Sequence, residues 1–352
     1  MKKVEYIIIG QGVAGSCFAL KLIQENKSFI IIDQNTNKAS SVAVGIYNPV
    51  VLKRFSLIWN AVEQLKLMKD YFDSFEELLG EKYLYKLPTY RIIRDDNEIH
   101  AWKKKVEKPE LIPFLNSKIH SETLSNFSTP FGYGEVMQTG RIRLRKYLDD
   151  FRNYLINNNQ YLDESFDFSQ LSVTDDNVQY HNIKANKIIF CEGFGIKQNP
   201  YFNYLPIIGV KGEVLKIKTN EKIPPAIWKA HNFLMPTTDN YAYAASTYDR
   251  DDLTPTPTEK GKQEILTHLK TFYKDSFKVV SHYAGVRPTV IDRRPIIGSH
   301  SIYKNLFILN GMGTRGTLLA PQMTEYLFNS IEKKIEIDKE ANIRRFDYLF
   351  NS

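Results

Sequence analysis

The chain has 352 residues with 43% hydrophobic and 25% charged residues, the proportions of a globular protein long enough for one large core or two domains. Its net charge of +7 suits either a solvated surface or an anionic partner, and we favour the first because basic charge alone specifies no partner. The two cysteines are isolated, which argues against a disulfide scaffold and predicts a protein of the reducing cytoplasm. The seven histidines are scattered, which argues against a metal site, and the sequence has no apolar run long enough for a membrane span.

The N-terminal segment Val4–Asp33 predicts a β–α–β unit. An apolar run, Tyr6–Ile9, ends in a Gly-x-Gly-x-x-Gly motif, a helical pattern follows, and a second apolar run, Phe29–Ile32, ends in Asp33. The first glycine permits a tight turn, the second lets a pyrophosphate approach the backbone, and the third lets helix and strand pack closely. The helix start offers free N–H groups to phosphates.

This unit predicts a dinucleotide site for FAD or NAD, with a glycine-rich turn in an ordinary α/β domain as the alternative. The Asp33 carboxylate is expected to accept hydrogen bonds from ribose hydroxyls. The cofactor contacts predicted in this segment are Gly10, Gly12, Val13, Ala14, Gly15, Asp33 and Gln34.

The middle of the chain alternates predicted helices and strands. Periodicity and punctuating residues indicate a helix over Trp59–Leu79, a strand over Tyr90–Ile93, a helix over Asn97–Val106, an irregular segment over 107–135, a helix over Gly140–Asn157 and a strand over Lys187–Cys191. Cys17 and Cys191 are both expected to be small buried residues.

The last part of the chain begins with β-rich segments. Predicted strands cover Val214–Lys218, Tyr241–Ser246 and Lys278–Tyr283, with one helix over Lys260–Tyr273 between them. We expect a mostly antiparallel sheet that covers the cofactor domain. A strand at Leu306–Leu309, a glycine-rich turn at Asn310–Gly316 and a helix at Leu318–Ile331 follow, with Pro321 expected in the first turn of that helix.

Two C-terminal blocks, YAGVRPTVIDRRPIIG at Tyr283–Gly298 and LFILNGMGTRGTLLAP at Leu306–Pro321, resemble the D-amino-acid oxidase superfamily of FAD-dependent oxidoreductases when they are combined with the N-terminal motif. The segment AASTYD at Ala244–Asp249 resembles the superfamily's GxTYE strand, although Ala245 replaces a common glycine. Arg293 and Arg294 stand where the superfamily commonly has a glycine, and 84–140 carries no recognisable landmark.

The resemblance implies an α/β fold with a Rossmann-like FAD-binding domain and a smaller α+β substrate domain built on a mostly antiparallel sheet. We expect the FAD-binding domain to be discontinuous, over 1–82, 136–206 and 284–352, and the substrate domain to comprise 83–135 and 207–283. The FAD is expected to be non-covalent, since neither cysteine occupies an obvious attachment position.

Further cofactor contacts follow from the same resemblance. Ala39–Pro49 is similar to the superfamily's Ser-rich loop that contacts the flavin, and the C-terminal glycine turn precedes a helix whose N–H groups can face the flavin N1–C2=O edge. The alternative for these glycines is a simple strand–helix turn. The residues implied are Ser41, Gly45, Gly193, Gly311, Gly313, Thr314, Arg315, Gly316 and Thr317.

For the substrate, the resemblance implies that Arg287 binds an amino-acid carboxylate, which a guanidinium matches bidentately. The alternative is a structural arginine paired with an acid such as Asp292. Tyr248 is expected to line the substrate pocket and Arg315 to stabilise the reduced flavin. The implied reaction is oxidation of a primary or secondary amine by hydride transfer to flavin N5, giving an imine that hydrolyses.

A second resemblance concerns Gly45-Ile-Tyr-Asn-Pro49 and the GMGTRG ending, which are similar to the FAD oxidase domain of the bifunctional tRNA 5-methylaminomethyl-2-thiouridine biosynthesis protein. It implies oxidation of carboxymethylaminomethyluridine in tRNA as the alternative to a free amine or amino acid. A non-catalytic flavoprotein and an NAD(P)-dependent dehydrogenase are further alternatives. The electron acceptor is O₂ or an unidentified carrier.

Overall fold

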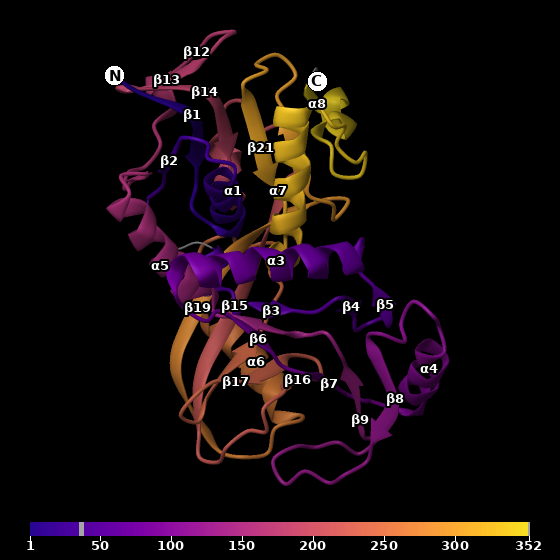
Figure 1. Ribbon diagram of the computed structural model, residues 1–352. Coiled ribbons are helices and arrows are strands. Elements are labelled where there is room, and N and C mark those ends of the chain that lie inside the picture. Colours follow the sequence, from indigo (N-terminus) through magenta and orange to yellow (C-terminus); the bar gives the residue numbers. More distant parts are fainter. Residues whose placement is uncertain (35–38, 351–352) are drawn as a thin grey trace.

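The structure is a computed structural model that describes residues 1–34 and 39–350. The chain forms two lobes, one above the other in Figure 1, with the long helix α3 (Ala61–Leu79) crossing between them. Both termini lie at the far end of the upper lobe, in which early and late segments of the chain lie side by side. Segments from both ends of the sequence therefore build one lobe together.

The upper lobe holds a sheet of eight strands, five of which (β11, β2, β1, β14 and β21) run parallel. Its strands are β1 (Lys2–Ile9), β2 (Phe29–Ile32), β11 (Tyr161–Leu162), β12 (Leu171–Val173), β13 (Val178–Tyr180), β14 (Ile183–Phe190), β20 (Ile296–Ser299) and β21 (Leu306–Asn310). The spatial order is β11-β2-β1-β14-β13-β12, with β21 paired to the end of β14 and β20 paired to β21. Fully buried apolar runs such as Phe29–Ile32 are typical of such a parallel sheet.

The lower lobe holds a second sheet of eight strands, antiparallel except where β16 meets β7. Its strands are β7 (Thr89–Ile92), β8 (Leu115–His120), β9 (Tyr133–Val136), β15 (Ile207–Thr219), β16 (Ile227–Lys229), β17 (Phe233–Pro236), β18 (Tyr241–Ala245) and β19 (Phe277–Val290). The order is β19-β15-β18-β17-β16-β7-β9-β8. The prediction of a mostly antiparallel sheet is confirmed.

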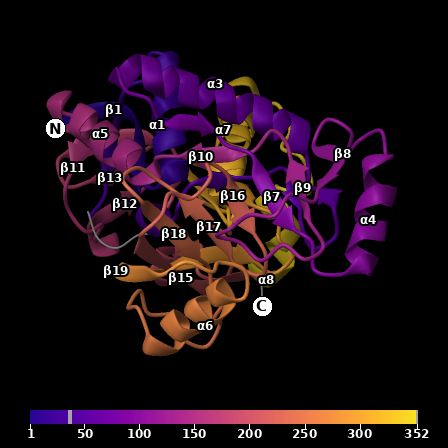
Figure 2. The ribbon, with the colours of Figure 1, turned by 90° about the horizontal axis from the view of Figure 1, so that it is seen from below.

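The remaining strands form two small sheets, from β3 (Ile46–Tyr47), β10 (Gly140–Ile142) and β6 (Leu84–Lys86), and from β4 (Val50–Val51) and β5 (Ser56–Leu57). The other helices are α1 (Val13–Gln24), α2 (Ala39–Val42), α4 (Asp96–Val106), α5 (Leu144–Asn157), α6 (Glu259–Lys270), α7 (Gly316–Lys333) and α8 (Asp347–Phe350), with 3₁₀ turns η1 (Phe168–Gln170), η2 (Gly193–Gln198) and η3 (Ile343–Phe346). Helix α6 packs against β15 and β18, and in the view from below it lies at the outer edge of the molecule, next to β15 (Figure 2).

The N-terminal unit folds as predicted, because α1 begins directly after the glycine turn and packs against α7. Cys17 and Cys191 are buried, which confirms that expectation. The start of α4 shows how local sequence sets a helix end: the Asp95 carboxylate accepts the Glu98 N–H at 2.8 Å, and Lys103–Lys105 complement the dipole in its last turn.

Four local predictions are wrong. Segment 107–135 is not wholly irregular, because it contains β8 and the start of β9, whose Gly134 leaves room for the Trp102 ring where a Cβ would lie 2.5 Å away. Gly140–Ile142 forms β10, so the helix there begins only at Leu144. Val62, which the helical periodicity of 59–79 places among the apolar positions, is 67% exposed and not part of the apolar face of α3. Pro321 is the sixth residue of α7, beyond its first turn.

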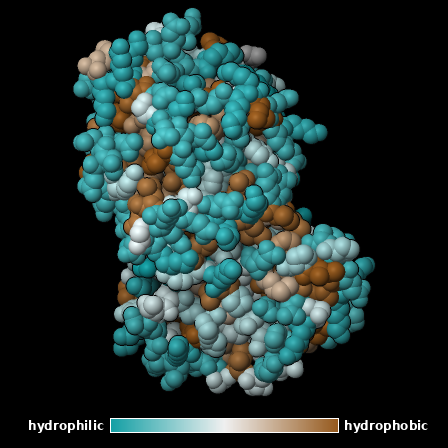
Figure 3. All heavy atoms as spheres, in the orientation of Figure 1, coloured by the Kyte–Doolittle hydropathy of each residue, from teal (hydrophilic) through white to brown (hydrophobic). Residues whose placement is uncertain are grey.

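The surface view is largely hydrophilic, with apolar side chains gathered near the junction of the two lobes (Figure 3). Within the described residues, no helix has both the length and the apolar character needed to cross a bilayer.

Candidate active site

A cavity of about 1000 Å³ lies between the two lobes, and we call it the central cavity. Its wall combines the start of α1, the end of β2, the segment 39–46 and the turn after β14 with residues of the second sheet and the loop before α7. Segments far apart in the sequence therefore converge on one site. The volume lies at the upper end of the range for small-molecule pockets and suits a large ligand with a second, smaller one.

The glycine motif shapes one end of the central cavity. Gly10 has φ +97°, and a Cβ there would lie 2.7 Å from the carbonyl oxygen of Cys191. Gly12 precedes α1 without a side-chain cap, and the Val13 N–H donates to Ser40 Oγ at 3.3 Å. The helix start thus presents backbone N–H groups and the positive end of the dipole to the cavity, as a pyrophosphate requires.

Asp33 lies at the end of β2 in the cavity wall and is 7% exposed. Its Oδ1 accepts the Gln11 N–H at 3.0 Å, and the Tyr161 hydroxyl lies 3.0 Å from its Oδ2. The carboxylate therefore fixes the glycine turn while it faces the cavity, a position that suits contact with a ribose.

The opposite end is formed by the loop between β21 and α7. Gly313 has φ +53°, and its N–H donates to the Pro288 carbonyl at 2.9 Å, which ties the loop to β19. Gly313, Thr314, Arg315, Gly316 and Thr317 all line the cavity. The start of α7, which carries no acid in its first turn, points its N–H groups at the same space.

Three predicted cofactor residues do not line the cavity. A Cβ at Gly15 would lie 1.9 Å from the Gly10 carbonyl oxygen, and one at Gly311 would lie 2.5 Å from Val290 Cγ2, so both glycines serve close packing behind the wall. Ser41 faces a neighbouring cleft, and Ser40 takes its place in the cavity wall. The remaining predicted contacts, including Val13, Ala14, Gln34, Gly45 and Gly193, do line the cavity.

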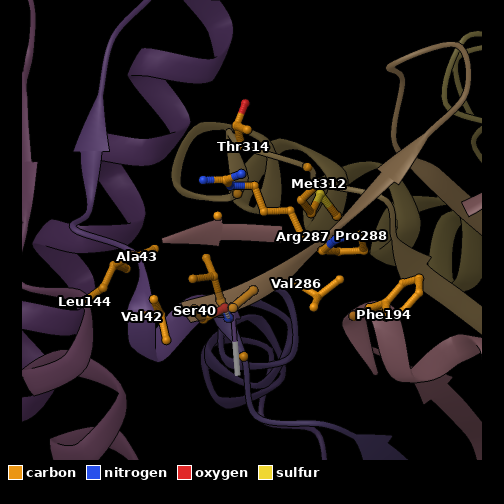
Figure 4. A pocket seen from close by; sticks show the side chains of 18 of the residues that line it. Ser40, Val42, Ala43, Leu144, Phe194, Val286, Arg287, Pro288, Met312 and Thr314 are labelled. Atoms are coloured by element: carbon orange, nitrogen blue, oxygen red, sulfur yellow. Dashed lines mark hydrogen bonds between the residues drawn. The ribbon is translucent and has the colours of Figure 1, made fainter. Parts of the chain in front are cut away.

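Arg287 extends from β19 into the central cavity beside the loop that carries Thr314, and Val42, Ala43 and Leu144 line the facing wall (Figure 4). Its Nη1 donates to the carbonyl oxygens of Thr247 at 3.2 Å and Lys211 at 3.4 Å. Burial lowers the pKa of the Arg287 guanidinium, which still remains charged. No acidic side chain pairs with it in 1–34 or 39–350.

The predicted alternative partner, Asp292, is engaged elsewhere. Its Oδ2 lies 2.9 Å from Arg345 Nε in a salt bridge. The interpretation of Arg287 as a structural partner of Asp292 is therefore wrong, because Arg287 lies on β19 in the cavity wall, whereas Asp292 follows that strand and pairs with Arg345.

Tyr248 and Arg315 complete this end of the cavity. The Tyr248 ring lies 4.9 Å from the Arg287 guanidinium carbon, and Tyr248 is 67% exposed. Burial lowers the pKa of Arg315, an effect that the nearby Tyr248 opposes. Two guanidinium groups without an acidic partner in the described chain give this region positive charge, which favours an anionic ligand.

Other residues of the cavity wall could not be predicted from the sequence, because they belong to no recognisable motif. Asn232 is 2% exposed, lines the cavity, and its amide nitrogen has no hydrogen-bond partner among the described residues. Lys229 lies in the same wall, and burial lowers its pKa to about 8, with Arg91 contributing. Both follow Trp228 in a segment that looks like an ordinary strand, so only the fold reveals them.

Glu192 gives a prediction on pH dependence. Burial raises the pKa of its carboxyl from 4.5 to about 7, although Asn199 Nδ2 donates to it at 2.7 Å. Between these pH values the unfolded chain loses the proton and the native chain keeps it, so this group destabilises the fold as pH rises. Glu192→Gln removes this pH-dependent destabilisation. In the flavin-free protein, the free energy of unfolding of the variant minus that of the wild type should therefore be about 2–3 kcal/mol larger at pH 8 than at pH 4.5.

Urea unfolding of both proteins at the two pH values measures this difference. An equal effect of the substitution at both pH values would contradict the prediction. Glu192 lines the central cavity directly after β14, so the same substitution reports on the electrostatics of the cavity wall.

The wall as a whole fits a dinucleotide. A side chain on Gly12 would enter the space before α1, two helix starts face the cavity, and Asp33 lies at the end of the second strand. The same cavity extends to Arg287 on the second sheet, which leaves room for a small ligand beyond the dinucleotide.

Comparison with known proteins agrees with this geometry. A curated relative, the tRNA 5-methylaminomethyl-2-thiouridine biosynthesis bifunctional protein of Legionella pneumophila (strain Corby), is 24% identical over 94% of this chain and 54% of its own length. A protein of the same name from Leptospira borgpetersenii serovar Hardjo-bovis (strain JB197) is 24% identical over 88% of this chain and 54% of its own length. The chain thus spans about half the length of these relatives.

Solved structures share the fold at low sequence identity. Iminodiacetate oxidase from Chelativorans sp. BNC1 superposes with a TM-score of 0.80 at 16% identity, covering 96% of this chain and 98% of that one. Glycine oxidase from Geobacillus kaustophilus superposes with a TM-score of 0.78 at 16% identity, covering 96% of each. The family model for DAO, FAD dependent oxidoreductase, matches residues 5–329, and this chain belongs to that family of FAD-dependent oxidoreductases.

Proposed function

We propose that this oxidoreductase oxidises the C–N bond of a glycine-type amine whose carboxylate is bound by Arg287. The observation that carries the proposal is the charged Arg287 guanidinium, which lines the central cavity without an acidic partner in the described chain and is held by two main-chain carbonyls. A guanidinium in this state binds a carboxylate through paired, charge-assisted hydrogen bonds.

FAD, when bound, supplies the hydride acceptor. The residues of this chain do the positioning: Arg287 fixes the substrate carboxylate, and the start of α7 with Arg315 favours negative charge nearby. The buried amide of Asn232 offers a hydrogen-bond donor to a substrate or cofactor oxygen. Val42, Ala43 and Leu144 give the wall that faces Arg287 an apolar surface.

A second candidate is an amine attached to tRNA, which the names of the curated relatives favour. The net charge of +7 agrees with that substrate. The two candidates share one reaction and differ in what the amine is attached to.

Anaerobic bleaching of the flavin spectrum separates the candidates. The panel contains glycine, sarcosine, iminodiacetate, D-amino acids, proline and tRNA bearing carboxymethylaminomethyluridine, with N-methylethylamine as the amine that lacks a carboxylate. Reduction by a carboxylate-bearing amine and not by N-methylethylamine supports the proposal. Reduction by neither free amines nor the tRNA would contradict it.

Gly212 provides an independent test of Arg287. A Cβ at Gly212 would lie 1.8 Å from Arg287 Nη2, the mobile end of that side chain, so Gly212→Ala should displace the guanidinium and leave the fold intact. We expect the KM of the reducing amine to rise about tenfold, with unchanged FAD content, because one of two charge-assisted contacts is lost.

The double variant Gly212→Ala/Arg287→Leu sharpens this test. If the substitution at Gly212 acts through Arg287, the kcat/KM of the double variant should be no lower than that of Arg287→Leu alone. Additive losses in kcat/KM would mean that Gly212 contributes by another route.

A further inference from the structure

The connection between β18 and α6, residues 247–258, borders the central cavity, and we call it the strap. Most of its residues are exposed, yet Tyr248, Leu253 and Pro255 line the cavity wall. The strap belongs to no helix and to none of the named strands. Contacts with the rest of the fold must therefore hold these three residues at the cavity.

Strand β15 provides those contacts at both ends of the strap. Side chains alternate along the strand, so Gly212 lines the cavity whereas its neighbours Lys211 and Glu213 are buried behind the wall. The Glu213 N–H donates to Thr247 Oγ1 at 3.0 Å, which fixes the start of the strap. The Glu213 carboxylate accepts the Thr258 N–H at 3.0 Å and the Thr258 hydroxyl at 2.7 Å, which fixes its end.

Lys211 holds the middle of the strap. Its N–H donates to the Asp249 carbonyl at 2.7 Å, and its own carbonyl accepts the Asp249 N–H at 3.1 Å. Its Nζ forms a salt bridge with Asp252 Oδ2 and lies 3.5 Å from Thr254 Oγ1. Asp252 Oδ1 in turn accepts the Thr254 N–H at 2.8 Å. One side chain thus anchors the stretch of the strap that carries Leu253 and Pro255.

The same contacts determine how Arg287 is held. Its Nη1 donates to the carbonyls of Thr247 and Lys211, and the Tyr248 ring lies 4.9 Å from its guanidinium carbon. Both carbonyls and the ring therefore belong to the strap or to the residue that anchors it. In the described chain, Nε and Nη2 of Arg287 donate no hydrogen bond, so this pair of donors is left for a carboxylate.

Packing alone does not explain a lysine at position 211. The Lys211 side chain is fully buried, and burying an ammonium group is costly unless it is paired, so an apolar residue of similar length would fill the space at lower cost. Hydrogen bonds from Lys211 and Thr254 hold the pKa of the Asp252 carboxyl well below its usual value, so Asp252 stays ionised. The ion pair adds direction, which an apolar contact does not.

We infer that Lys211 is a positioning residue for the substrate site: its ion pair with Asp252 fixes the strap, and the Thr247 carbonyl and the Tyr248 ring then orient Arg287 toward the carboxylate of the substrate. This inference rests on the proposed carboxylate role of Arg287. It extends the site to a charged pair that does not touch the substrate, since neither Lys211 nor Asp252 lines the central cavity.

The test measures binding of methoxyacetate to the oxidised holoenzyme through the change in flavin absorbance. Methoxyacetate carries the carboxylate but has an ether oxygen in place of the amine, so it binds without turnover. Lys211→Met removes the charge, keeps the length of the side chain and leaves Asp252, which is 32% exposed, in contact with water. We expect Kd to rise about tenfold, with FAD content and melting temperature close to those of the wild type.

A second variant breaks the pair from its exposed side. Asp252→Asn should raise Kd about three- to tenfold, and Lys211→Met/Asp252→Asn should bind no more weakly than Lys211→Met alone, because both substitutions remove one interaction. In an Arg287→Leu background, Lys211→Met should cause no further loss. A merely structural lysine would lower affinity in that background as well.

Lys260→Met is the matched control. Lys260 is 80% exposed, and its Nζ lies 3.6 Å from Asp249 Oδ2, so this variant removes a surface ion pair made by the same strap. It should change Kd less than about twofold, as expected for an exposed pair.

An unchanged Kd in Lys211→Met and Asp252→Asn, an equal loss in the control, a further loss in the Arg287→Leu background, or a wild type that does not bind methoxyacetate would each overturn the inference. If Lys211→Met does not fold, Asp252→Asn decides. A holoenzyme that binds methoxyacetate in a Lys211-dependent way but is reduced by no amine would refute the proposed oxidation and leave the positioning role intact.

Discussion

Replacing Arg287 by leucine should lower kcat/KM for the reducing amine about 1000-fold, equivalent to about 4 kcal/mol of transition-state stabilisation, while FAD content stays that of the wild type. The guanidinium lines the central cavity and, in the described chain, donates hydrogen bonds to the main-chain carbonyls of Thr247 and Lys211 and pairs with no acid, so leucine breaks no ion pair. The loss should therefore fall on substrate binding and orientation. Steady-state kinetics with quantification of bound flavin measures it.

Two controls make this result specific. Arg287→Lys keeps the charge but not the fork of paired donors, so its kcat/KM should lie between those of the wild type and the leucine variant. Arg54→Leu removes an exposed arginine that lines neither cavity and should have no effect. An unchanged KM in Arg287→Leu with full flavin content would refute the carboxylate role.

The parts of the fold that local physics dictates could be predicted from the sequence. The glycine turn, the apolar strand Phe29–Ile32 and the helix between them depend on residues within thirty positions, and the structure places them as expected. The C-terminal glycine turn before α7 followed from the same kind of pattern. Such elements carry their own turn and capping signals.

What could not be predicted depends on contacts between distant segments. β9 carries Gly134 where a strand usually has a side chain, and only the Trp102 ring packed over it explains the glycine. Asn232 and Lys229 reach the cavity because β16 and β17 join a sheet whose strand order no local pattern specifies. Ser40 replaced Ser41 for the related reason that a shift of one residue changes which side of a short helix faces the cavity.

A second cleft, beside the central cavity, shows the same limit: its basic residues are visible in the sequence, but their grouping in space is not. The cluster Arg141, Arg143, Arg145 and Lys146 is visible in the sequence, where basic charge alone favours a solvated surface. The structure shows that these side chains line a cavity together with Lys216 and Tyr283, which lie 70 or more positions away. Charge becomes informative only when the fold shows which cations already have partners.

Gly12→Val should yield a folded protein that lacks FAD. A Cβ at Gly12 would lie 3.2 Å from Ser40 Oγ, a contact that a small shift relieves, while the valine methyl groups enter the space before α1 that a pyrophosphate needs. We expect FAD affinity to fall at least about 100-fold, equivalent to about 3 kcal/mol. Absorbance at 450 nm of the purified protein and calorimetric titration with FAD measure the loss.

Gly15→Ala is the informative contrast, because both glycines belong to one motif but meet different neighbours. A Cβ at Gly15 would lie 1.9 Å from the Gly10 carbonyl oxygen. This oxygen belongs to the backbone, so it cannot move away without disrupting the glycine turn. This variant should therefore lose the fold itself, seen as a lower melting temperature or insoluble protein. A Gly12→Val protein that purifies yellow would contradict the placement of the pyrophosphate, whereas equal unfolding of both variants would mean that Gly12, too, serves packing and not the cofactor.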